Sequence, residues 1–105
     1  MVNKIMSLWS GNKKTKALDS ATKSGITTWL RRSISRSFRA HDHKLVTKFE
    51  RALLEFRRGN YTEAKWCMEE IHSALETMRK YDRLTRAQFI EKRILTIWLE
   101  KLGRL

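Results

Sequence analysis

The sequence contains no proline, four glycines and a single cysteine in 105 residues. Folds built from many short strands need frequent turns, which proline and glycine usually supply. Their scarcity argues against a β-sandwich or β-barrel and favours an all-α fold. Because Cys67 is alone, an intramolecular disulfide and a cysteine metal cluster are both excluded, and we expect this thiol in the core.

Long apolar runs are also missing, since no segment approaches the ~20 apolar residues of a membrane-spanning helix. The first 14 residues, MVNKIMSLWSGNKK, carry most of their charges after an interrupted apolar stretch, which is the wrong order for a secretory signal. We therefore expect a protein that is neither secreted nor membrane-spanning and that resides in the cytoplasm, the nucleus or both.

Acidic residues are scarce in the first part of the chain. Residues 1–48 hold eleven Lys and Arg against two acids, whereas residues 49–105 hold twelve against nine. The net charge of +12 is therefore concentrated at the front, where it amounts to +9. Such an excess favours a polyanion partner, which can be a nucleic acid, an anionic lipid or an acidic protein surface.

Apolar residues recur at steps of three and four and predict four helices. The predicted helices run from Ser24 or Gly25 to about His41, from Asp42 to Gly59, from about Thr62 through Met78, and from Thr85 to the end of the chain. Asp42 is the expected N-cap of the second helix, and the Thr85–Gln88 spacing fits a capping box. We predict a small bundle of three to four helices over residues 25–105, preceded by a flexible, basic amphipathic arm and linker over residues 1–24.

The last predicted helix has an unusually wide apolar arc, about 200 degrees when side chains are placed at 100 degrees per residue. Such a helix is either central in the bundle or shared with a second subunit, and we expect a homodimer through it. Tryptophans occur once per segment, and Trp29 and Trp98 suit the core better than Trp9 and Trp66 do. The candidates for a dimer or partner contact are Trp66, Trp98, Leu102 and Leu105.

Arginine and serine alternate with apolar residues over residues 26–39, ITTWLRRSISRSFR. Both side chains bond phosphate oxygens, so this stretch suggests a surface for RNA or another polyanion, although a merely solvated helix side would look similar. The candidate binding residues are Arg31, Arg32, Arg36, Arg39, Lys44 and Lys48. Ser33, Ser35 and Ser37 lie beside arginines, as basophilic kinases prefer, and their phosphorylation would cancel much of the charge.

The apolar residues of the arm suggest a weaker alternative. Ile5, Leu8 and Trp9 could enter an anionic membrane while the following lysines meet the headgroups. A single short arm binds only marginally, so the basic face would have to add a second contribution.

Catalytic patterns are hard to find. The three residues His41, Asp42 and His43 point in different directions on a helix, and we expect capping or solvent roles for them. Cys67 and His72 do not share a face, and Glu69, Glu70 and Glu91 are expected as isolated carboxylates on polar faces. No phosphate-binding glycine loop or histidine–acid metal spacing occurs. We expect neither an enzyme nor a cofactor.

The segment LLEFRRGNYTEA, residues 53–64, carries two resemblances. Its Gly59–Ala64 turn resembles the helical hairpin of a single tetratricopeptide-type repeat. Stretched to Leu75, the segment is also similar to the geminiviral pre-coat proteins, with Leu53, Leu54, Arg57, Asn60, Tyr61, Glu63 and Ala64 as matching positions. The proline-containing region and the cysteine–histidine cluster of that family are absent here. The resemblance implies a small viral accessory protein that suppresses RNA silencing.

Two hypotheses about function follow. In the first, a basic helical accessory protein binds the RNA backbone, or another polyanion, to counter host defence or support replication. In the second, the chain is an adaptor that grips a host or viral protein through its helical surfaces.

Overall fold

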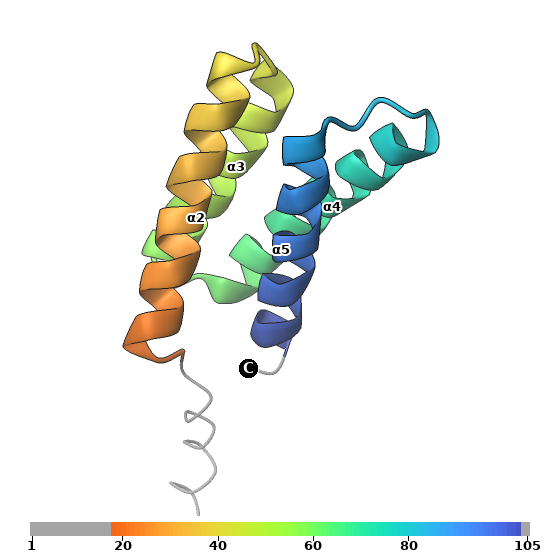
Figure 1. The fold of residues 1–105 in the computed structure, drawn as a ribbon. Coiled ribbons are helices and arrows are strands. Elements are labelled where there is room, and N and C mark those ends of the chain that lie inside the picture. The colour runs from red at the N-terminus through yellow and green to blue at the C-terminus, as the bar shows by residue number, and fades with distance from the viewer. Residues whose placement is uncertain (1–17, 104–105) are drawn as a thin grey trace, which may run out of the picture.

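The computed structural model describes residues 18–103, which form four α-helices and no β-strand (Figure 1). The helices are α2 (Ser20–Arg39), α3 (His43–Arg57), α4 (Tyr61–Lys80) and α5 (Arg86–Gly103). The prediction of a small all-α bundle is confirmed. The predicted arm with Ile5, Leu8 and Trp9, and the predicted contact residue Leu105, lie outside the described residues.

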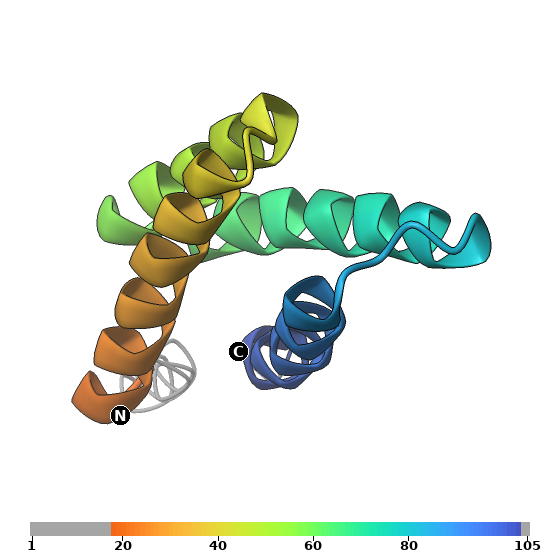
Figure 2. The ribbon, with the colours of Figure 1, turned by 45° about the horizontal axis from the view of Figure 1, so that its top comes forward.

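Each helix packs against the one that follows it in the chain and runs in the opposite direction (Figure 1). The hairpin of α2 and α3 is crossed at an angle by α4, and α5 then runs back beside α4 (Figure 2). The carboxyl end of α5 therefore comes close to the start of α2. As a result, the first and last described helices are brought within side-chain reach of each other.

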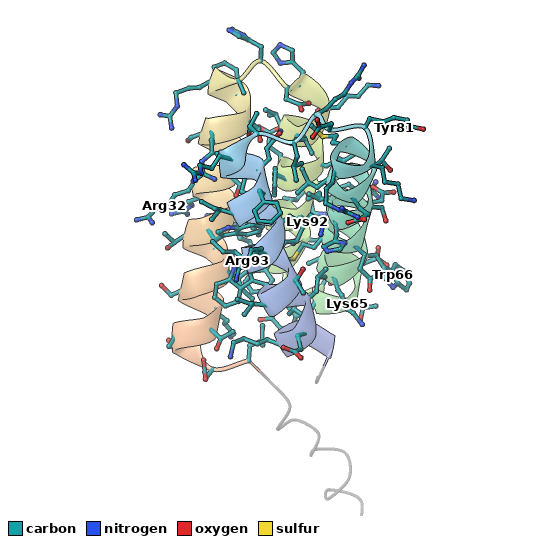
Figure 3. The ribbon with its side chains drawn as sticks, turned by 45° about the vertical axis from the view of Figure 1, so that its right-hand side comes forward. Arg32, Lys65, Trp66, Tyr81, Lys92 and Arg93 are labelled. Atoms are coloured by element: carbon teal, nitrogen blue, oxygen red, sulfur yellow. The ribbon has the colours of Figure 1, made fainter. Side chains whose placement is uncertain are left out.

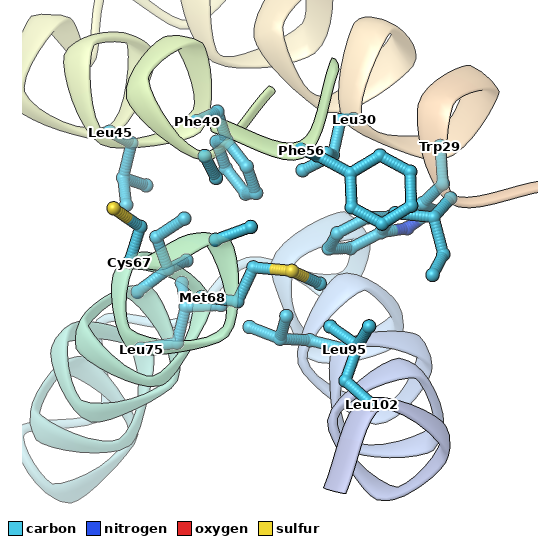
Figure 4. Packing of buried hydrophobic residues seen from close by; sticks show 14 residues of the cluster. Trp29, Leu30, Leu45, Phe49, Phe56, Cys67, Met68, Leu75, Leu95 and Leu102 are labelled. Atoms are coloured by element: carbon cyan, nitrogen blue, oxygen red, sulfur yellow. The ribbon is translucent and has the colours of Figure 1, made fainter. Parts of the chain in front are cut away.

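The core is made of apolar side chains from all four helices (Figure 4). Its buried members are Ile26, Trp29, Leu30, Leu45, Phe49, Ala52, Phe56, Ala64, Cys67, Met68, Ile71, Leu75, Leu95 and Leu102. Trp29 meets Phe49 edge to face, with ring centroids 5.7 Å apart. The predicted core positions of Cys67 and Trp29 are confirmed.

Two predicted helix starts are confirmed by their hydrogen bonds. The Asp42 carboxylate accepts from the Leu45 backbone N–H at 3.2 Å and caps α3. Thr85 and Gln88 form a capping box, because the Gln88 N–H donates to the Thr85 hydroxyl at 3.1 Å and the Thr85 N–H donates to the Gln88 side chain at 3.1 Å.

The start of the first helix was predicted wrongly. It begins at Ser20, where the Asp19 carboxylate accepts from the Thr22 N–H at 2.6 Å, and not at Ser24 or Gly25. Gly25 lies inside α2 and faces Trp98: a Cβ on Gly25 would lie 3.1 Å from Cη2 of the indole. The glycine therefore marks a close approach between α2 and α5.

Candidate polyanion-binding surface

Four of the predicted binding residues share one side of α2. Together with Ser35 they line a shallow surface hollow, and we call these five residues the arginine face: Arg31, Arg32, Ser35, Arg36 and Arg39. At 100 degrees per residue they fall within an arc of about 140 degrees. No Asp or Glu occurs between Ser20 and Arg39, so no acid of α2 dilutes this charge. Figure 3 shows Arg32 pointing away from the bundle.

Ser33 and Ser37 lie on the opposite side of α2 and are buried. They continue the core stripe of Ile26 and Leu30 at helical spacing, which is a signal that sequence reasoning missed because it counted hydroxyl residues as polar surface. A kinase would reach these two hydroxyls only if the helix moved out of the core, whereas Ser35 is the exposed serine of the three. Phe38, expected in the apolar stripe, is 62% exposed.

Arg36 differs from the other arginines because it forms an ion pair with Glu91 of α5. The Glu91 side chain is 2% exposed, whereas that of Arg36 is 39% exposed. Burial raises the pKa of Glu91 above its ordinary value, and the charge of Arg36 opposes this shift. The expectation that Glu91 is an isolated carboxylate on a polar face is wrong, and Arg36 contributes to the packing of α5 on α2.

The two predicted lysines belong to another surface. Lys44 and Lys48 line a hollow on α3 with His43 and Thr47. The Lys48 ammonium lies 3.4 Å from a carboxylate oxygen of Glu70. The six predicted cations are therefore divided between two hollows, four of them on α2 and two on α3.

Three cations of the arginine face form no ion pair among the described residues and are therefore free to bind an anion. Within residues 18–103, Arg31, Arg32 and Arg39 form no ion pair, and all three are exposed. Arg36, in contrast, has part of its charge neutralised by Glu91. The strongest anion-binding potential of this surface thus lies with the three unpaired guanidiniums.

The residues predicted as partner contacts have different environments. Trp66 is 57% exposed on α4 (Figure 3). It borders a hollow with Arg51, Glu63, Cys67 and Glu70. Leu102 is buried in the core, and Trp98 packs on Gly25 with its indole nitrogen buried. Trp98 and Leu102 therefore make contacts within the chain. Of the three described candidates for a partner contact, Trp66 alone is largely exposed.

The other titratable residues that the sequence singles out have separate local environments. Asp42 is the α3 cap, His41 is exposed with a φ of 60°, and the His72 ring lies 3.1 Å from the Thr96 hydroxyl. In the described part of the chain, no three His, Cys, Asp or Glu side chains are grouped so that they could hold a metal ion. None of the helices in that part has the length and apolarity needed to cross a membrane.

Comparisons with profiles of known families, with curated proteins and with solved structures found no match to this chain. The Gly59–Asn60 turn does join α3 and α4 into an antiparallel helical hairpin, as the sequence predicts. The resemblance of residues 53–75 to the pre-coat proteins stays a prediction.

Proposed function

We propose that this chain binds the phosphate backbone of RNA, or a chemically similar polyanion, through the arginine face. The observation that carries the proposal is the group Arg31, Arg32 and Arg39, which is exposed and unpaired within the described residues on a helix without acids. Guanidinium groups donate two parallel hydrogen bonds to phosphate oxygens, and the Ser35 hydroxyl adds a further donor.

The spacing of these cations also favours an anionic ligand. Arg36 lies four residues after Arg32 and three before Arg39, so these charges repel along the helix surface, and the ion pair of Arg36 with Glu91 offsets only part of this repulsion. Each such pair costs a few tenths of a kcal/mol in an isolated helix. A bound polyanion replaces this repulsion with attraction. Because no base-reading motif accompanies the arginines, the backbone and shape of the RNA would govern recognition.

A role as a viral accessory protein is consistent with this chemistry. The local similarity of residues 53–75 to pre-coat proteins supports a function in countering RNA silencing or in supporting replication. Such a protein would act in the cytoplasm or nucleus, where its RNA ligands are. Its homodimer would have to use surfaces other than Trp98 and Leu102, which are internal.

A second candidate function is that of a protein-interaction adaptor, and Trp66 favours it. The exposed indole borders a hollow that is lined by the acids Glu63 and Glu70 and by the cation Arg51. A large exposed aromatic side chain with two carboxylates in the same hollow suits a basic segment of a host or viral protein. Capture of one such protein at high salt, lost in Trp66→Ala, would support this function.

Charge reversal on the arginine face tests RNA binding. The variant Arg31→Glu/Arg32→Glu/Arg39→Glu leaves Arg36 in place, because a glutamate there would oppose buried Glu91. We expect it to weaken binding of a labelled RNA duplex, measured by fluorescence anisotropy, by about 100-fold or more at physiological salt. Wild-type binding should itself weaken steeply as salt rises.

The matched control reverses three cations at the α4–α5 connection: Lys80→Glu/Arg83→Glu/Arg86→Glu. All three side chains are exposed, and the change in net charge is the same. Far-UV circular dichroism should be unchanged in both variants. Equal loss of affinity in the two variants would show that net charge alone, and not the arginine face, attracts the RNA.

A further inference from the structure

α5 carries apolar side chains on two sides, and one of these sides is exposed in the described part of the chain. Leu95 and Leu102 are buried against the other helices, whereas Phe89, Ile90 and Ile97 are 47%, 52% and 51% exposed. A helix that is apolar on its outer as well as its inner side is typical of a helix with a further partner.

Cations accompany these exposed apolar residues. We call the group the outer face of α5; its members are Arg86, Phe89, Ile90, Arg93, Ile97 and Lys101, all exposed. All but Phe89 fall within an arc of about 80 degrees at 100 degrees per residue. Figure 3 shows Arg93 on this side of α5. Glu100, the one acid among the exposed residues of α5, falls between Phe89 and Arg93 on the same wheel. The outer face therefore combines apolar surface with three cations against one acid.

The combination of apolar surface and positive charge fits some classes of partner better than others. Two copies meeting through the outer face would bring Arg86, Arg93 and Lys101 together with the same cations. Each copy has one acid of this face, Glu100, to offset its three cations, so the net repulsion opposes association. An RNA backbone would satisfy the cations but would leave Ile90 and Ile97 in water. An anionic lipid surface satisfies both, because headgroups meet the cations and the acyl boundary receives the apolar side chains.

We propose that the outer face of α5 binds an anionic membrane surface, with the helix lying in the plane of the interface. The apolar patch alone would bind marginally, and the cations supply the second contribution that stable attachment needs. The proposal concerns residues other than the arginine face, and it does not depend on RNA binding.

Flotation with vesicles tests the proposal on the full chain. We expect the protein to float with vesicles of about 30% phosphatidylserine in phosphatidylcholine and to stay behind with phosphatidylcholine alone. The variant Phe89→Ser/Ile90→Ser/Ile97→Ser should lower the partition coefficient about tenfold or more. The comparison variant Ile5→Ser/Leu8→Ser/Trp9→Ser likewise replaces three apolar residues with serine, but in the amino-terminal arm.

Failure of wild-type protein to float, or full flotation of the α5 variant, overturns the proposal. Retained RNA affinity in the α5 variant, together with lost flotation, shows that the two surfaces act separately. If the α5 variant unfolds, a polarity-sensitive fluorophore on Ile97→Cys replaces it, with Ser73→Cys on the exposed side of α4 as control. Cys67 is buried and should label slowly. Anionic vesicles should shift the emission of the Ile97 label to shorter wavelength and leave the Ser73 label unchanged, and equal shifts contradict the proposal.

Discussion

Arg36 of α2 and Glu91 of α5 form an ion pair whose carboxylate is buried while its guanidinium reaches the surface. The pair joins the first and last described helices, which are 55 residues apart in the chain at this point. Because a buried charge is tolerated only when it is paired, the pair ties the arginine face to the packing of α5. Arg36 thus has a structural task that Arg31, Arg32 and Arg39 do not share.

We expect Arg36→Ala to lower the free energy of unfolding by about 3 kcal/mol, because it leaves Glu91 buried without its partner. Urea denaturation monitored by circular dichroism measures this change. Arg31→Ala is the matched control and should stay within about 0.5 kcal/mol of wild type. The double variant Arg36→Met/Glu91→Leu should recover most of the lost stability. A small effect of Arg36→Ala would mean that water reaches Glu91 or that its carboxyl takes up a proton in the variant.

Glu91 and Glu76 should contribute to the pH dependence of stability in opposite directions. Burial raises the pKa of Glu91, so its contribution to stability is complete below its ordinary value of 4.5 and is lost as the pH rises through the raised folded-state pKa. Glu91→Gln should therefore gain stability relative to wild type as the pH rises above 4.5. Urea denaturation between pH 4 and pH 8 measures this difference.

The contribution of Glu76 to stability should depend on pH in the opposite direction. Arg79, at 2.6 Å, and Lys92, at 3.1 Å, lower its pKa from 4.5 to about 2. Its contribution is present above pH 4.5 and is lost as the pH falls toward 2. Glu76→Gln should therefore lose stability relative to wild type above pH 4.5 and match it in acid. Parallel pH profiles for the two glutamine variants would contradict the assignment of Glu91 as the buried carboxyl.

A double-mutant cycle tests the contact between Gly25 and Trp98. Alanine is more favourable than glycine in a helix interior by about 1 kcal/mol. In the wild-type background we expect Gly25→Ala to gain little, because its Cβ would press on the indole at 3.1 Å. In a Trp98→Leu background the full gain should appear, giving a coupling of at least about 0.5 kcal/mol in urea denaturation. Identical effects in both backgrounds would show that the indole moves away freely.

Phosphorylation should distinguish the three serines of α2. A basophilic kinase should modify exposed Ser35 and leave buried Ser33 and Ser37 unmodified in the folded chain. Site-resolved mass spectrometry measures this. The phosphate at Ser35 should weaken RNA binding because it places about two negative charges among the arginines. Ser35→Ala is the control, and rapid modification of Ser33 in folded protein would contradict its burial.

Helices and caps were predictable because their determinants are local. Asp42 and the Thr85–Gln88 pair form hydrogen bonds with backbone groups within three residues. Apolar stripes can be recognised from the spacing of apolar residues along the sequence. The start of α2 was missed because Asp19 stands in a polar stretch that lacks an apolar stripe. The division of the six predicted cations between α2 and α3 depends on how these helices pack, which spacing along the chain does not encode.

The amino-acid sequence by itself determined that the chain is helical, where most helices begin and end, and that the first half is strongly basic. Spacing along one helix also decided which arginines share a side. Tertiary structure alone decided that Glu91 is buried beside Arg36, that Gly25 packs against Trp98, and that Phe89, Ile90 and Ile97 are exposed among the described residues. The physical reason is that burial of a side chain depends on which distant helix packs over it.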